Sequence, residues 1–264
     1  MNQVGVIGAG VMGEALIAAL ISYGTAPASI TISEKRKDRA DELRTRYGIK
    51  VEDVATNVSK ADALLLVVKP QDMAAVLDEI KGSINKSAVV ITFAAGKKIS
   101  FIQHGLGTGN PVVRVMPNTP TLVGAGMAAI SIGAGVSADQ SKFVSGFLAA
   151  TGKVIEVSED LQDAVTATSG SGPAYFFRFV EAMVDGAKGL GLSEADATTL
   201  TIQTIVGAAK LLDESGKNAT TLRENVTSPN GTTAAALASF ESHQLGDVVA
   251  QAMKAARDRS QELA

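Results

Sequence analysis

The chain has 264 residues, of which 46% are hydrophobic, and a formal net charge of -3. This length suits one large or two ordinary domains, and the acidic balance gives no electrostatic reason to expect nucleic acid or an anionic membrane surface as a partner. No cysteine is present, which excludes disulfides, a thiol nucleophile and cysteine metal ligands and is consistent with a cytoplasmic protein. No stretch is long and uncharged enough to span a bilayer, and no carboxylate cluster or histidine pair predicts a metal site.

The first 20 residues predict a buried strand, a glycine turn and a helix in immediate succession. Three glycines have the GxGxxG spacing where a continuous apolar run changes to helical periodicity. The first would allow a tight turn, the second would let the backbone approach a pyrophosphate at the helix N-terminus, and the third would let the helix pack on the strand. A glycine-rich turn without a ligand is the alternative, but the strand before and the helix after favour dinucleotide binding. The predicted cofactor-binding residues here are Gly8, Gly10, Val11, Met12 and Gly13.

Residues 29–33 predict a second strand, which ends where a dinucleotide fold recognises the adenine ribose. Glu34 is placed to bind the 2′-hydroxyl of NAD, whereas Lys35 and Arg36 could hold the 2′-phosphate of NADP. The same charges could simply form the solvated first turn of a surface helix. Because two cations adjoin the expected ribose site, we favour NADPH over NADH as the cofactor.

Further strands are predicted where short apolar runs alternate with helical patterns. They are residues 63–68, 88–93, 112–115, 126–132 and 153–157. This alternation predicts a doubly wound parallel sheet of the Rossmann type, whose ligands bind beyond the carboxyl ends of the strands. We expect this dinucleotide-binding domain to cover residues 1–160.

The chain changes character after residue 160, where long helical patterns replace strands. We therefore expect residues 161–264 to form an all-helical domain. The helix predicted over residues 194–214 is apolar on more than one face and needs cover on several sides. We expect a second copy of the chain to provide that cover, so this domain would also be the site of dimerisation.

Two segments of the helical part are too polar and too rich in glycine to be ordinary connectors. Residues 163–175 have the sequence DAVTATSGSGPAY, and residues 226–233 have the sequence VTSPNGTT. A hydroxyl-rich turn that leads into a helix offers backbone N–H groups and hydroxyl donors to a small carboxylate. Each segment could equally be a helix cap, because Ser, Thr and Gly commonly precede a first helical turn.

Six motifs together resemble those of the pyrroline-5-carboxylate reductase family. They are GAGVMG from Gly8, VVKP from Val67, AAG from Ala94, RVMPNTP from Arg114, DAVTATSGSGPAY from Asp163 and VTSPNGTT from Val226. The resemblance covers nearly the whole chain, in order. It implies an oxidoreductase that reduces the cyclic imine 1-pyrroline-5-carboxylate to L-proline by hydride transfer from NADPH or NADH, the last step of proline biosynthesis. It also implies a helical C-terminal domain that forms a homodimer or a higher homo-oligomer.

The resemblance assigns most of the remaining site residues. Around the cofactor it implies Asn57, Lys69, Pro70 and Asn118. We expect Val68, Ala95 and Gly96, which lie at the carboxyl ends of predicted strands within the VVKP and AAG motifs, to bind the cofactor as well. Around the substrate carboxylate and imine nitrogen it implies Ser228, Gly231, Thr232 and Thr233, and we expect Asn230 of the same motif to bind there too. Thr233 would be the catalytic residue, donating a hydrogen bond to the ring nitrogen. Asn230 departs from the family, which usually has glycine there, and Lys69 could instead be an exposed cap residue beside Pro70.

The motifs contain no histidine that could act as an acid, which agrees with reduction of an imine. His104 and His243 stand outside every motif, although reduction of a carbonyl usually recruits a His, Lys or Tyr acid. A cyclic imine can be protonated in solution, so the protein needs mainly to hold it against the nicotinamide. Two alternatives stay open: a dehydrogenase of the 3-hydroxyacid type, with Lys188 or Lys210 as its catalytic lysine, and a non-catalytic nucleotide-binding regulator.

Overall fold

The computed structural model describes residues 1–263 and divides the chain into two compact units. The first comprises Met1–Ser171 and the chain from Ala255 onward, and the second comprises Gly172–Lys254. The division comes later than the boundary expected at residue 160, which stays a prediction. Residues that follow 160 belong to the first unit because they bond to the sheet, as Gln162 does through its Nε2 to Ser131 Oγ at 2.8 Å. No helix within residues 1–263 combines the length and the apolar character needed to cross a membrane.

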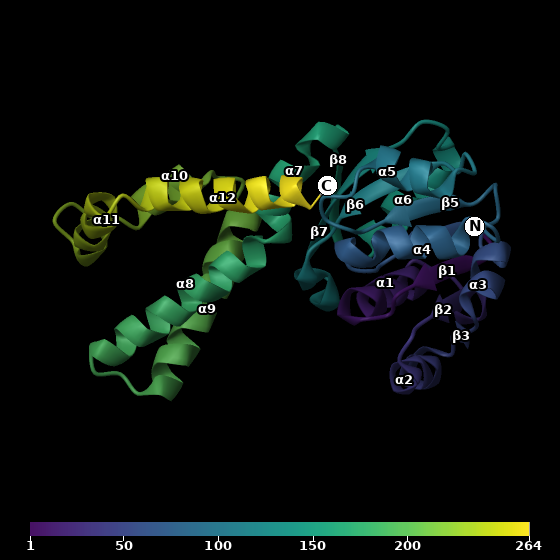
Figure 1. Cartoon of the computed structure of the whole chain (residues 1–264). Coiled ribbons are helices and arrows are strands. Elements are labelled where there is room, and N and C mark those ends of the chain that lie inside the picture. Colours follow the sequence, from purple (N-terminus) through teal and green to yellow (C-terminus); the bar gives the residue numbers. More distant parts are fainter. Residues whose placement is uncertain (264) are drawn as a thin grey trace. The chain divides into compact units, whose positions relative to one another are not determined.

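One eight-stranded sheet organises the first unit, with the strand order β3-β2-β1-β4-β5-β6-β7-β8 (Figure 1). The strands are β1 Val4–Ile7, β2 Ile30–Ser33, β3 Lys50–Val51, β4 Ala63–Leu66, β5 Val89–Thr92, β6 Val112–Met116, β7 Gly126–Ile132 and β8 Gly152–Glu156. The predicted doubly wound parallel sheet is confirmed for β1 to β6. β7 runs antiparallel to β6, and β8 runs parallel to β7. A 3₁₀ turn at Thr119–Val123 joins β6 to β7, which is too short for the crossover that a parallel neighbour requires.

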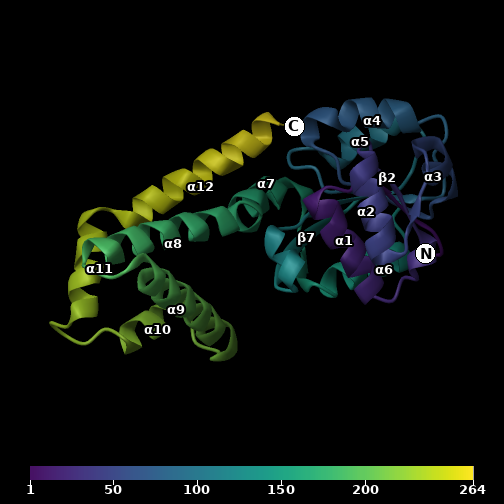
Figure 2. The same ribbon diagram turned by 90° about the horizontal axis from the view of Figure 1, so that it is seen from below.

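Helices cover both faces of this sheet (Figure 2). They are α1 Val11–Ser22, α2 Lys37–Tyr47, α3 Val54–Lys60, α4 Met73–Ile80, α5 Ile99–Leu106 and α6 Ala138–Ala149. One apolar core lies between the sheet and α1, α2 and α6, and a second lies between the sheet and α3, α4 and α5. Neighbouring strand residues enter opposite cores, as Val6 and Ile7 of β1 do. Burial on both faces explains why these strands are continuous apolar runs in the sequence.

Local signals set where the helices begin and end. Ser137 Oγ accepts the Gln140 N–H at 3.2 Å, and Gln140 Oε1 accepts the Ser137 N–H at 2.9 Å, so a reciprocal capping box begins α6. Gly48 ends α2 with a left-handed φ of 69°, which glycine adopts without a steric penalty. Both signals lie within one turn of the helix end that they set.

The described residues of the second unit form helices joined by short turns, with no strand among them. Its helices are α8 Gly172–Gly189, α9 Glu194–Glu214, α10 Ala219–Asn225, α11 Thr232–Ser242 and the part of α12 (Leu245–Glu262) that precedes Ala255. α8 and α9 pack side by side, and the rings of Phe179 in α8 and Phe240 in α11 are 6.4 Å apart. Among the described residues of this unit, Ala197 is the one hydrophobic residue that is buried, whereas Phe176 and Phe177 are 62% and 64% exposed. Such an apolar surface needs cover from another protein.

Candidate functional site

The loops that follow five neighbouring parallel strands meet at one edge of the sheet. Ile7, the last residue of β1, pairs in register with Ser33 of β2 and with Leu66 of β4. Leu66 in turn pairs with Thr92 of β5. β6 runs beside β5 in the same direction. Most of the predicted cofactor residues follow these strand ends and are thereby brought to this edge: Gly8, Gly10, Glu34, Lys35, Arg36, Val68, Lys69, Pro70, Ala95, Gly96 and Asn118.

The glycine loop contains one position with open space around it. Gly8 has a φ of +87°, and a Cβ there would lie 2.8 Å from the carbonyl oxygen of Val67. A Cβ on Gly13 would lie 2.4 Å from the carbonyl oxygen of Gly8, so the packing of the loop requires both glycines. A Cβ on Gly10 would meet no atom of the described chain within 4 Å. The fold around Gly10 does not need a glycine there, which agrees with its predicted task of letting a ligand approach the backbone.

Helix α1 begins beside this open space without a capping side chain. Its N-cap is Gly10, and no side chain accepts a hydrogen bond from its first N–H groups. Val11 is exposed and Met12 is half-buried. Free N–H groups at the positive end of a helix bind phosphate readily. The residues present therefore fit the pyrophosphate of a dinucleotide.

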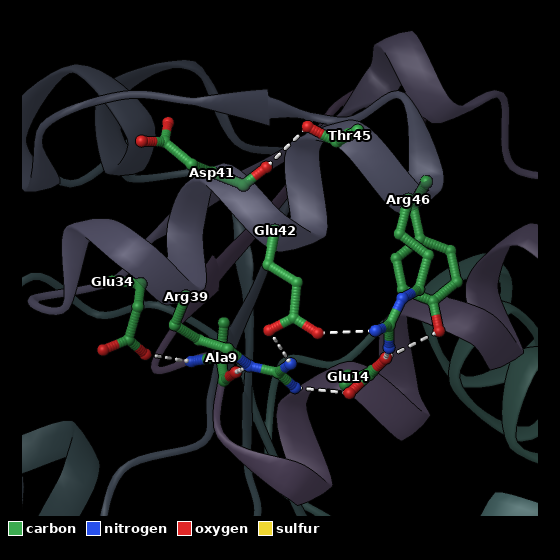
Figure 3. A network of polar contacts seen from close by, with 9 residues as sticks. Ala9, Glu14, Glu34, Arg39, Asp41, Glu42, Thr45 and Arg46 are labelled. Atoms are coloured by element: carbon green, nitrogen blue, oxygen red, sulfur yellow. Dashed lines mark hydrogen bonds and ion pairs between the residues drawn. The ribbon is translucent and has the colours of Figure 1, made fainter.

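Glu34 and Arg39 bind the two peptide groups of Ala9 in the middle of the glycine loop (Figure 3). Glu34 Oε2 accepts the Ala9 N–H at 2.9 Å, and Glu34 Oε1 accepts the Arg36 N–H at 3.0 Å. Arg39 Nε donates to the Ala9 carbonyl oxygen at 3.2 Å. The Glu34 carboxylate therefore faces the glycine loop from the end of β2, where the ribose site was predicted.

Arg39 also belongs to a network of ion pairs between α1 and α2 (Figure 3). Glu14 accepts hydrogen bonds from Arg39, from Arg46 and from the Tyr47 hydroxyl, the last at 3.0 Å. Glu42 accepts from Arg39 at 2.7 Å and from Arg46 at 2.5 Å. Burial raises the pKa of Glu14, but the three hydrogen bonds together outweigh it and hold the pKa below its ordinary value. The Arg39 guanidinium is thus neutralised by carboxylates of the protein itself.

Two other cations at this edge are uncompensated. Lys35 and Arg36 have exposed side chains and no ion-pair partner among residues 1–263. Both are available to a 2′-phosphate, while the adjacent Glu34 carboxylate is available to a 2′-hydroxyl. The residues that would favour NAD and those that would favour NADP therefore lie side by side in the structure as well.

Two asparagines that the resemblance assigns to the cofactor make bonds within the protein. Asn57 is buried; its Nδ2 donates to Ser33 Oγ at 3.0 Å, and its Oδ1 has no partner in the described chain. Asn118 is buried as well; its Nδ2 donates to the Ser169 carbonyl oxygen at 3.1 Å, and its Oδ1 accepts the Met127 N–H at 2.8 Å. Contacts of these asparagines with a cofactor stay predictions. Their bonds in the structure hold the backbone around the site.

The other residues assigned to the cofactor differ in exposure. Val68, Pro70 and Ala95 are half-buried. Lys69 is exposed at the N-cap of the 3₁₀ turn Pro70–Asp72, and its side chain makes no capping bond. Gly96 has a φ of +75°, and a Cβ there would lie 2.7 Å from the carbonyl oxygen of Ser260 in α12. The end of α12 therefore packs directly on the loop after β5.

The residues assigned to the substrate lie together in the second unit, in a turn and the first turn of α11. They are Ser228, Asn230, Gly231, Thr232 and Thr233. Asn230 has a left-handed φ of 60°, the conformation for which the usual glycine of the family is suited. Gly231 is the N-cap of α11 and donates its N–H to the Ser228 carbonyl oxygen at 3.0 Å. Thr233 is half-buried, and its hydroxyl has no partner within residues 1–263.

The other hydroxyl-rich segment contains a π-helical turn that the sequence did not predict. α7 (Gln162–Val165) continues into the π-helical residues Thr166–Gly170, and the Ser171 N–H donates to the Thr166 carbonyl oxygen at 2.8 Å. Its hydroxyls are used locally; Thr168 Oγ1 donates to the Ala164 carbonyl oxygen at 2.8 Å. The Asn118 bond fastens this turn to the loop after β6. Such turns are frequent at functional sites, and here the turn packs beside Asn118 at the predicted cofactor site.

Comparisons with known proteins agree with this architecture. Residues 159–263 match the family described as pyrroline-5-carboxylate reductase dimerisation, and residues 3–96 match the family described as NADP oxidoreductase, coenzyme F420-dependent. The pyrroline-5-carboxylate reductase of Corynebacterium melassecola is 42% identical over 267 residues, covering 100% of this chain and 99% of that protein. This chain belongs to the pyrroline-5-carboxylate reductase family. The reductase of Pseudomonas aeruginosa is 40% identical over 264 residues, with 99% and 97% covered.

Solved structures of pyrroline-5-carboxylate reductases share the fold over the whole chain. The protein of Coxiella burnetii gives a TM-score of 0.91 at 35% identity, covering 100% of this chain and 98% of its own. The protein of Plasmodium falciparum, solved with NADP bound, gives a TM-score of 0.90 at 28% identity, covering 99% and 98%. The match to the dimerisation family includes the entire second unit, whose apolar side chains are exposed in the single chain.

Sequence reasoning about this reductase missed two residues that shape the predicted cofactor site. The first is Arg39, which directly precedes Ala40 in α2. Ala40 and Leu43 form the buried face of this helix, so a cation beside that face was the sequence signal for a partly buried arginine. Gly5 lies within β1, and a Cβ there would be 2.6 Å from Asn57 Oδ1; a glycine inside a strand signals such a close approach. Within residues 1–263, no group of three His, Asp or Glu side chains is placed to hold a metal ion.

Proposed function

We propose that this chain reduces 1-pyrroline-5-carboxylate to L-proline with hydride from a nicotinamide cofactor, the last step of proline biosynthesis. The observation that carries the proposal is the match of the whole chain to reductases of that name at 42% and 40% identity. The open turn at Gly10 and the uncapped start of α1 would bind the dinucleotide that the reaction needs. Hydride transfer is the chemistry that the cofactor supplies when bound, and the residues of the chain bind and orient the reactants.

The first unit would hold the cofactor, and NADPH is the preferred one. Both oxygens of the Glu34 carboxylate accept backbone N–H groups, so its charge is partly compensated. The charges of Lys35 and Arg36 are not compensated within the described chain. The balance of charge at the ribose site therefore favours a 2′-phosphate.

The substrate would bind at the start of α11 in the second unit. The first N–H groups of α11 have no capping side chain and suit the substrate carboxylate, with Ser228 and Thr232 as further donors. Thr233 would donate its hydroxyl proton as a hydrogen bond to the ring nitrogen. A threonine hydroxyl is too weak an acid to protonate the imine outright, so the substrate arrives protonated or water replenishes the proton.

Two copies of the chain would assemble through their second units. Exposed apolar side chains occur on every helix of this unit except the short α10, including Phe176, Leu200, Phe240 and Val248. A homodimer buries such a surface at low cost, because the same patch on each copy meets its equivalent. Light scattering at micromolar concentration should give at least a dimer, and a monomer would contradict this part of the proposal. The cytoplasmic location expected from the lack of cysteine stays a prediction.

The purified chain tests the reaction directly. Oxidation of NADPH and of NADH should depend on 1-pyrroline-5-carboxylate, while 3-hydroxyisobutyrate should support no reduction of NADP⁺ or NAD⁺. The lysines that a 3-hydroxyacid dehydrogenase would need are in ion pairs, Lys188 with Glu194 at 3.4 Å and Lys210 with Glu214 at 3.9 Å. Cofactor binding without imine-dependent oxidation would reject the reductase and leave a nucleotide-binding regulator.

A further inference from the structure

We propose that Arg39 is a positioning residue for the cofactor, because it fixes the Ala9 peptide groups of the glycine loop together with Glu34. The inference rests on the proposed function for the identity of the ligand, a nicotinamide dinucleotide. It concerns the residues of the first unit alone. As a consequence, the affinities for NADPH and for NADH should both depend on the Arg39 side chain, although neither cofactor needs to contact it.

The glycine loop needs such a restraint. Ala9 is buried, but it lies between Gly8, which has a φ of +87°, and Gly10, which has open space around it. Glycines on both sides leave the Ala9 peptide groups free to rotate as far as local sterics are concerned. Rotation of the peptide group that joins Ala9 to Gly10 would turn the Gly10 N–H away from a phosphate at the start of α1.

The two contacts with Ala9 act on opposite ends of the residue. Glu34 Oε2 accepts its N–H at 2.9 Å, and Arg39 Nε donates to its carbonyl oxygen at 3.2 Å (Figure 3). Glu34 follows β2 directly, and Arg39 lies in the first turn of α2. Residues from one neighbouring segment therefore determine how both peptide groups of Ala9 are oriented.

Arg39 is itself held firmly. Its side chain is 12% exposed, and its remaining nitrogens bind Glu14 in the first turn of α1 and, at 2.7 Å, Glu42 in α2. One guanidinium thus connects the turn of the glycine loop to the helix whose N-terminus binds the phosphate. Restraints of this kind raise affinity by removing the ordering cost from the binding step.

This role differs from recognition of a 2′-phosphate. Glu14 and Glu42 already neutralise Arg39, whereas Lys35 and Arg36 are uncompensated. A residue that orients the loop should affect NADPH and NADH equally. A residue that binds the 2′-phosphate should affect NADPH alone.

Two substitutions of Arg39 separate the loop contact from the ion pairs. Gln has its amide nitrogen at the same position along the side chain as the Arg Nε, so Arg39→Gln keeps a donor for Ala9 and loses the charge. Lys has a methylene at that position and its ammonium one atom further out, so Arg39→Lys keeps a cation for Glu14 and loses the donor to Ala9. The two variants are therefore matched controls for each other.

Direct titration of the cofactor fluorescence measures the dissociation constants of NADPH and NADH, and thermal unfolding measures stability. Arg39→Lys should weaken both cofactors by about three- to tenfold, as expected for one hydrogen bond, and leave kcat at saturating cofactor and the KM for the imine near wild type. Arg39→Gln should keep near wild-type affinity for both cofactors and should be the less stable variant. If Arg39 only stabilised the fold, the less stable variant, Arg39→Gln, would bind both cofactors more weakly than Arg39→Lys.

Several outcomes would overturn the inference. Wild-type affinities in Arg39→Lys would show that the Ala9 contact does not position the loop, and weaker binding of NADPH alone would reassign Arg39 to the 2′-phosphate. Equal losses in the Gln and Lys variants would show that affinity does not depend on the donor to Ala9, because Arg39→Gln keeps that donor. Because binding is measured without turnover, the expected pattern in a chain that fails to reduce the imine would reject the proposed function and keep the positioning role.

Discussion

Gly10→Ala should show that cofactor binding by the glycine loop (residues 8–13) can be lost while its folding is kept. A Cβ at Gly10 would meet no described atom within 4 Å, and the φ of -65° at this residue is accessible to alanine. Replacing a glycine N-cap by alanine should therefore cost no more than about 1 kcal/mol of the free energy of unfolding. At Gly13 the same substitution places a Cβ 2.4 Å from the Gly8 carbonyl oxygen, which costs about 1–3 kcal/mol as overpacking.

The effect of Gly10→Ala on the cofactor should be much larger than its effect on stability. The added methyl group would occupy the space through which we expect a pyrophosphate to reach the first N–H groups of α1. Hydrogen bonds to a charged group contribute about 1.5–3 kcal/mol, so losing one should raise the dissociation constants of NADPH and NADH roughly ten- to a hundredfold.

Chemical unfolding and cofactor titration on the same preparations test this prediction. Gly10→Ala should unfold at nearly the wild-type denaturant concentration and bind both cofactors weakly, while Gly13→Ala should be clearly less stable. The reasoning would be refuted if Gly10→Ala bound NADPH as tightly as wild type, because the open space would then have no part in binding. A Gly10→Ala protein as unstable as Gly13→Ala would show that the space is needed by the fold.

Substitutions at three further positions test other parts of the site. Thr233→Ala should lower kcat roughly ten- to a hundredfold with unchanged cofactor affinity, and Thr233→Ser should recover much of the rate. If Thr233 were only a helix cap, Thr233→Ala would instead cost about 1 kcal/mol of stability and leave turnover unchanged. Unfolding and single-turnover measurements on the same variant distinguish the two results. Arg36→Ala should raise the KM for NADPH far more than that for NADH in steady-state assays, and equal effects would remove the 2′-phosphate assignment. Glu14→Gln should destabilise the chain at neutral pH, because the pKa of Glu14 is lowered in the folded state and the ionised carboxylate is the stabilised form. That difference should shrink as the pH falls below about 4 and through the lowered folded pKa, which urea unfolding at pH 7 and pH 3 would measure.

The sequence predicted those parts of the fold that depend on local patterns. The strand, turn and helix around Gly8 and the strand Gly126–Ile132 follow from periodicity and glycine spacing, and the structure has them at these positions. The direction of β7 could not be predicted in the same way. It depends on how far the 3₁₀ turn Thr119–Val123 can carry the chain, and the apolar pattern of a strand contains no information about its direction.

The site was predicted less completely, because its bonds join residues far apart in the sequence. The GxGxxG spacing identifies Gly10 but gives no indication that Glu34 and Arg39 bind the neighbouring Ala9. Asn118 could be placed near the cofactor only by resemblance, and its bond to Ser169 depends on a π-helical turn that has no sequence signal. Helix propensity and periodicity are local, whereas these contacts are set by tertiary packing.

The reaction proposed for this chain depends on which side chains the proposed substrate segment contains. Residues 226–233 contain no titratable side chain, and both histidines are exposed and lie elsewhere, His104 in α5 and His243 directly after α11. His243 Nδ1 is 2.8 Å from the Ser239 carbonyl oxygen, a local contact at the end of its own helix. Reduction of a ketone needs an acid of suitable pKa beside the oxygen that gains charge, and this segment offers only hydroxyl and backbone donors. A cyclic imine that is already protonated needs orientation and a hydrogen bond to nitrogen, which Thr233 and the first turn of α11 can provide.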